Sequence, residues 1–66
     1  MKFERINDRQ YTAWLPDVGC VGYIQHRTNR KWSGHGSRGI YHWSIDELPT
    51  RLMVAVALAK MYEGAT

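Results

Sequence analysis

Apolar and polar residues alternate over several short stretches of the chain, which is the pattern of strands that bury one face. The clearest stretch is residues 20–27, which we predict to place alternate side chains on opposite faces of a sheet. One predicted face has Cys20, Gly22, Ile24 and His26, and the other has Val21, Tyr23, Gln25 and Arg27. Shorter strands are predicted over residues 3–6, 11–15 and 40–43, and the Gly- and Ser-containing residues 33–39 are predicted to form a loop.

A helical pattern follows these strands. Ser44 and Glu47 have the spacing of a capping box, in which each side chain binds the backbone N–H of the other residue. Pro49 suits the first position of the main helix, and Gly64 suits a C-terminal stop. We therefore predict one α+β domain over residues 1–66, a small antiparallel β-meander of about three strands packed by one C-terminal α-helix.

The predicted helix is apolar on two sides, and one side is enough to pack on a sheet. The first stripe is Leu48, Leu52, Ala55, Val56 and Ala59, and the second is Val54, Ala57, Leu58 and Met61. An apolar stripe left in water is typical of an interface. We predict that the second stripe forms a homodimer. The alternatives are that a different partner protein or the amino-terminal strand covers it, or that it stays exposed.

The length and cysteine content of the chain indicate the number of domains and the cellular compartment. A chain of 66 residues has room for one domain. The single cysteine, Cys20, cannot form an internal disulfide, which favours a reducing cytoplasm over secretion. The longest apolar run, Leu52–Ala59, is much shorter than the about 20 residues of a membrane-spanning helix, so no membrane partner is expected.

Positive charge is concentrated in the middle of the chain. The net charge is +3, and residues 18–45 contain four basic residues and no acidic residue. Aromatic residues lie between these cations, and this combination favours binding of phosphates and bases. The predicted binding residues for nucleic acid or another partner are Tyr23, Arg27, Arg30, Lys31, Trp32, Arg38 and Tyr41. The alternatives are a solvated basic loop, and tryptophans that simply build the core.

Two patterns resemble a catalytic or metal site, but neither has the context or spacing that such a site requires. Residues 34–39 spell GxGxxG, but no strand precedes them, no helix opens on them and no acid follows at the required distance. Cys20 and His26 lie about 20 Å apart along one predicted strand, too far apart for one zinc ion at 3.3 Å per residue. We therefore predict no catalytic residues, no metal and no cofactor, and a protein that is not an enzyme.

Gly22-Tyr23-Ile24, the basic segment, Trp32 and the following helix resemble the three-stranded-sheet DNA-binding domains of the integrase arm-binding and AP2 type. The resemblance covers roughly residues 20–62 and implies a sheet face laid in the major groove with the helix behind it. The longer loop at residues 33–39 and the position of Pro49 depart from that pattern. We predict a module that binds nucleic acid or a nucleoprotein complex. The alternative is a phage-type, anti-CRISPR-like inhibitor of a host protein machine.

Overall fold

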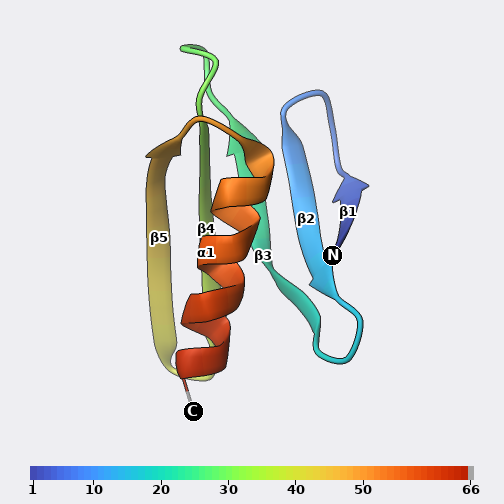
Figure 1. Cartoon of the computed structure of the whole chain (residues 1–66), viewed down its shortest axis with the longest axis vertical. Helices are drawn as coiled ribbons and strands as arrows, with labels where there is room; N and C mark the ends of the chain where they lie inside the picture. Colours follow the sequence, from blue (N-terminus) through green and yellow to red (C-terminus); the bar gives the residue numbers. More distant parts are fainter. Residues whose placement is uncertain (66) are drawn as a thin grey trace.

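The computed structural model describes residues 1–65, which form one antiparallel sheet with a helix across one face (Figure 1). The strands are β1 (Lys2–Arg5), β2 (Gln10–Leu15), β3 (Gly19–His26), β4 (Trp32–Arg38) and β5 (Tyr41–Leu48), and the helix α1 is Arg51–Gly64. The strands lie side by side in chain order, β1-β2-β3-β4-β5. The predicted α+β class with one C-terminal helix is confirmed, but the sheet has five strands where we predicted about three.

The predicted loop over residues 33–39 is wrong, because residues 33–38 belong to β4 and Gly39 alone lies in the following turn. Glycine usually weakens a strand, but it also allows close approach of a neighbouring element. A Cβ atom on Gly34 would lie 2.7 Å from Cγ1 of Val54 in α1, and one on Gly36 would lie 2.8 Å from Nε1 of Trp43. The glycines of β4 therefore make room for the helix and for an indole ring.

The predicted capping box is also wrong, because Ser44 and Glu47 belong to β5. Leu48 pairs with Trp32 of β4, and the apolar side chains of β5 pack on the core. This packing outweighs the local helix signal. The N-cap is Thr50, whose Oγ1 accepts a hydrogen bond from the Met53 backbone N–H at 3.1 Å. No helix within residues 1–65 has the length and apolar character needed to cross a membrane.

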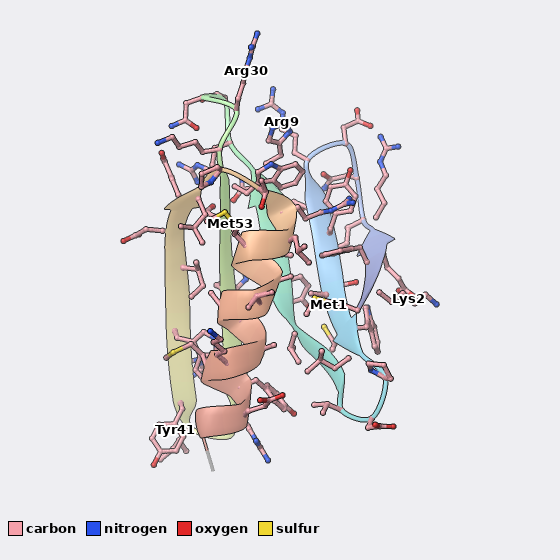
Figure 2. The ribbon with its side chains drawn as sticks, in the orientation of Figure 1. Met1, Lys2, Arg9, Arg30, Tyr41 and Met53 are labelled. Atoms are coloured by element: carbon pink, nitrogen blue, oxygen red, sulfur yellow. The ribbon has the colours of Figure 1, made fainter. Side chains whose placement is uncertain are left out.

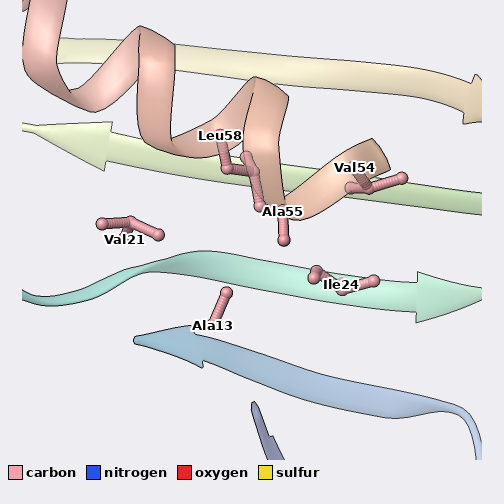
Figure 3. Close-up of a cluster of buried hydrophobic side chains, with 6 residues drawn as sticks. All are labelled: Ala13, Val21, Ile24, Val54, Ala55 and Leu58. Atoms are coloured by element: carbon pink, nitrogen blue, oxygen red, sulfur yellow. The ribbon is translucent and has the colours of Figure 1, made fainter. Parts of the chain in front are cut away.

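The core lies between α1 and the middle of the sheet (Figure 3). Its fully buried side chains are Ala13, Val21, Ile24, Val54, Ala55 and Leu58. Val54 and Leu58 are 0% exposed against the sheet, so two members of the predicted dimer stripe cannot form an interface. Ala57 is partly buried, and Met61 is exposed. The predicted stripe is wrong because the helix turns this side, and not the side of Leu52 and Val56, toward the sheet.

A bulge changes the predicted faces of β3. The register of β2 against β3 shifts between Ala13 and Trp14, and one extra residue of β3 lies opposite that step. Val21 is therefore turned into the core, although strict alternation predicted it on the exposed face of Tyr23. Cys20 pairs with Trp14 and lies on the face away from the helix.

Candidate nucleic-acid interface

The β3–β4 hairpin ends in a tight basic turn. The Arg27 N–H donates to the Lys31 carbonyl at 2.7 Å, and the Arg30 N–H donates to the Arg27 carbonyl at 3.2 Å. Arg30 has a φ of 67°, in the left-handed region that glycine and asparagine normally occupy. This is a type I turn followed by a left-handed residue, a common hairpin connection. The turn projects the side chains of Arg27, Arg30 and Lys31 into solvent.

A fourth cation, which sequence reasoning missed, joins this turn. The His26 N–H donates to the Arg9 carbonyl at 2.7 Å, so Arg9 lies beside the base of the β3–β4 hairpin. Figure 2 shows Arg9 and Arg30 at the same end of the molecule. The sequence offered no signal for this, because Arg9 lies in a segment whose charges cancel. We call Arg9, Arg27, Arg30 and Lys31 the basic end.

The cations of the basic end are exposed and have no acidic partner. Within residues 1–65 the ion pairs are Lys2–Glu4 and Arg5–Asp8, and neither includes a residue of the basic end. Glu47 reaches the turn, but it binds Asn29 there: Glu47 Oε2 accepts a hydrogen bond from Asn29 Nδ2 at 2.6 Å. The guanidinium and ammonium groups of the basic end are therefore available to an external anion.

The sheet face opposite α1, which we call the open face, adjoins the basic end. Thr12, Tyr23, His35 and Ser44 pair in a row across β2 to β5. Alternation places these residues opposite the core, because their strand neighbours face the helix. The rings of Tyr23 and His35 stack with centroids 5.2 Å apart and an interplanar angle of 26°. Tyr23 is 48% exposed, so the open face presents an aromatic surface to solvent.

A shallow groove connects the open face with the basic end. Its lining residues are Gln25, Arg27, Ser33, Gly34, His35, Ser44, Ile45, Asp46 and Glu47. The Arg27 side of the groove is basic and the β5 side is acidic. Between them lie the amide of Gln25 and the hydroxyls of Ser33 and Ser44, which can both donate and accept hydrogen bonds.

Trp32 does not belong to this surface. It is half-buried and packs against the core from the helix side of the sheet. Its ring stacks on His26 at 4.2 Å and 10°. The guanidinium carbon of Arg51 lies 4.3 Å from the ring centroid of Phe3, 4.9 Å from that of Tyr11 and 6.0 Å from that of Trp32. Trp32 is thus part of an aromatic cluster around Arg51 that joins β1 and β2 to the helix.

Tyr41 lies at the opposite end of the molecule from the basic end (Figure 2), and Arg38 pairs with it across the β4–β5 turn. Arg38 Nη1 donates to the Tyr62 carbonyl at 2.8 Å, and its guanidinium carbon lies 4.8 Å from the centroid of the Tyr62 ring. Arg38 therefore holds the end of α1 against β4. The structure brings Arg27, Arg30 and Lys31 together, with Tyr23 on the adjoining face, and separates them from Arg38 and Tyr41.

The cysteine and histidines are divided between the two faces of the sheet. His26 stacks on Trp32 on the helix side, whereas His35 and His42 pair with residues of the open face. The half-buried Cys20 thiol contacts the Gly22 carbonyl at 3.7 Å. In residues 1–65 no group of three or more His, Cys, Asp or Glu side chains has an arrangement that could hold a metal ion.

Comparison of the chain with protein-family models, with curated proteins and with solved structures gives no match. The resemblance to the integrase arm-binding and AP2 domains therefore stays a prediction. The geometry of the basic end and of the open face is therefore the basis for inferring function.

Proposed function

We propose that this protein is a non-enzymatic module that binds nucleic acid through the basic end and the adjoining open face. The observation that supports this most strongly is the convergence of Arg9, Arg27, Arg30 and Lys31, exposed and without ion pairs among residues 1–65. Cations that neutralise phosphates release counterions, and this release is the main source of affinity for nucleic acid.

The open face supplies a second kind of contact. The stacked pair Tyr23–His35 is accessible to solvent and is next to the groove that starts at Arg27. Exposed aromatic rings stack on nucleobases, and each such contact contributes about 1–3 kcal/mol. The open face thus suits unpaired bases, which can lie flat on the Tyr23–His35 pair.

The charges on the groove orient the ligand. Asp46 and Glu47 on the β5 side repel phosphates, whereas Arg27 on the other side attracts them. We therefore expect the backbone of the nucleic acid to run past the β2 and β3 side of the basic end. The bases then point over Gln25 and His35.

The test is a salt titration by fluorescence anisotropy with labelled single-stranded DNA, single-stranded RNA and duplex DNA. The variant Arg30→Glu/Lys31→Glu is compared with Lys2→Glu/Lys60→Glu, which has the same change in net charge away from the basic end. We expect the first variant to reduce the log–log salt slope by about 1.4 units on single strands and about 1.8 units on duplex DNA, because each phosphate contact contributes about 0.7 and about 0.9, respectively. The control should keep most of the wild-type slope.

Tyr23→Ala separates stacking from charge. It should weaken binding to single strands about tenfold or more without changing the salt slope, because stacking is not electrostatic. If wild-type protein binds none of the three probes at low salt, the proposal is wrong and the inhibitor of a host protein machine becomes the better hypothesis. Equal losses in the two charge variants would show that net charge, and not the basic end, governs binding.

A further inference from the structure

β5 is the longer of the two edge strands of the sheet. β5 has eight residues, whereas the opposite edge strand, β1, has four. Within residues 1–65, β5 pairs with one strand, β4. An edge strand presents unpaired N–H and C=O groups that can accept another strand. β1 is short and carries Lys2, Glu4 and Arg5, which discourage such pairing. β5 is therefore the edge suited to pairing with another chain.

An apolar flank lies beside this edge. One hollow is lined by Leu48, Leu52, Met53, Val56, Ala57 and Lys60, and another by Tyr41, His42, Trp43, Lys60, Met61, Gly64 and Ala65. Met53 and Met61, one in each hollow, are both 46% exposed. Figure 2 shows Met53 on the side of α1 that faces β5. Exposed apolar surface next to an open strand edge is typical of an interface.

We propose that a second copy of this chain pairs antiparallel with β5 about a two-fold axis at Ser44. In this register His42 lies opposite Asp46 of the partner subunit, and Trp43 lies opposite Ile45 of the partner subunit. His42 and Asp46 are both exposed, and the register places no like charges opposite each other. An imidazole N–H can donate to a carboxylate, and aromatic–aliphatic pairs across strands are stabilising. A two-fold axis centred on Trp43 or on Ile45 would not place a histidine opposite an aspartate.

From Tyr41 to Ile45 the backbone of β5 is regular and compatible with this register, and the register shift against β4 lies between Ile45 and Leu48. Gly39 has a φ of 63° and is followed by Ile40 at negative φ, as in a type II′ two-residue turn. Arg38 and Tyr41 pair across this turn, and in a two-residue turn of this type such a pair is hydrogen-bonded, so we infer that the N–H and C=O groups of Tyr41 point to β4. Because this direction alternates along an antiparallel strand, the peptide groups of His42 and Ser44 point to the open edge. Two copies of Ser44 can then exchange hydrogen bonds across the axis.

In the resulting dimer, the sheets of the two copies join into one continuous sheet. Both helices lie on the same face, with their apolar flanks turned toward the axis. The two open faces join, and the two basic ends point in opposite directions because the paired strands are antiparallel. The proposed contacts come from β5 and α1 alone, so the dimer can be confirmed or excluded independently of nucleic-acid binding.

The test is sedimentation equilibrium of the whole chain with charge variants of β5. His42→Asp should raise the dimer dissociation constant at least about tenfold, because it places like charges directly opposite each other twice per dimer. Asp46→Lys should weaken the dimer less, since it removes the favourable pair. The double variant His42→Asp/Asp46→Lys should restore dimerisation, because it reverses the pair. Gln10→Asp is the matched control, because it adds a carboxylate at an exposed position of β2, three strands away from β5.

Two outcomes overturn the proposal. One is a wild-type chain that remains monomeric at high micromolar concentration. The other is a dimer that Met53→Glu dissociates but that none of the β5 charge variants affects, since that result assigns the contact to the helix alone. Circular dichroism of each variant checks that the altered surface residues leave the fold intact.

Discussion

Glycine is used differently in two regions of this molecule. Beneath α1, a Cβ atom on Gly22, Gly34 or Gly36 would approach backbone atoms to between 2.5 and 2.8 Å. At the β3–β4 turn, the backbone has the left-handed conformation that suits glycine, but the residue there is Arg30. The sheet under the helix therefore requires the smallest residue for space. The turn has an arginine where the backbone alone would favour glycine.

Because of this difference, we expect the glycines beneath α1 to affect stability and Arg30 to affect binding. A non-glycine residue in the left-handed region costs about 1–2 kcal/mol, and such strain is commonly found at functional positions. Substitutions beneath α1 should consequently change the free energy of unfolding. Substitutions at Arg30 should chiefly change affinity for a polyanion.

The largest expected effect is at the helix side of the core. Leu58→Ala should lower the free energy of unfolding by about 3 kcal/mol, because it leaves a cavity at a side chain that is fully buried. Leu52→Ala makes the same chemical change at an exposed position of α1 and should change stability by less than about 0.5 kcal/mol. Urea unfolding at low protein concentration measures both. Similar losses would show that α1 packs with a different face toward the sheet.

A smaller loss is expected from closing the space under the helix. Gly34→Ala should lower the free energy of unfolding by about 2 kcal/mol, because the added Cβ lies 2.7 Å from Cγ1 of Val54 and 2.8 Å from the Tyr23 carbonyl oxygen. Gly64→Ala is the control, since a Cβ there meets no atom within 4 Å. Thermal unfolding followed by circular dichroism distinguishes them. An unchanged melting temperature for Gly34→Ala would contradict the close packing of α1 on β4.

The smallest change in stability is expected at the turn, with the opposite sign. Arg30→Gly should raise the free energy of unfolding by about 0.5–1 kcal/mol, because glycine adopts positive φ without strain. The same variant should weaken polyanion binding, since it removes one cation of the basic end. Arg30→Ala removes the cation but keeps the strained backbone, so it should lose affinity without gaining stability. A stabilised variant with full affinity would show that Arg30 is not a binding residue.

Local pattern alone was enough to predict much of the fold. The strands predicted over residues 3–6, 11–15 and 20–27 agree with β1, β2 and β3 to within one residue at each end. Alternation of this kind reflects one buried face, which depends on the sequence of the strand itself. The errors at Gly34 and Ser44 have a tertiary cause. β4 is a strand because α1 covers its glycines, and β5 continues past Ser44 because Leu48 pairs with Trp32.

The candidate site was only partly predictable for a similar reason. Arg27, Arg30 and Lys31 are close in sequence, and a hairpin turn keeps them together. Arg9, which immediately precedes β2, joins them through its carbonyl contact with His26 of β3, and charge counting along the chain cannot show this contact. The sequence groups Arg38 with the turn residues because it follows them within a few positions. β4 extends from the turn to Arg38 and so places Arg38 at the far end of the molecule.

The order of the elements has a consequence for synthesis. Every strand pairs with its sequence neighbour, so the sheet needs only short loops to form, and folds of this kind assemble quickly. Three of the six fully buried core side chains, Val54, Ala55 and Leu58, come from α1, which follows the whole sheet in the chain. The sheet therefore leaves the ribosome before the residues that complete its core. A chain that ends before α1 leaves Ile24 and Val21 uncovered, and apolar surface exposed in this way is prone to aggregation until the helix packs on it.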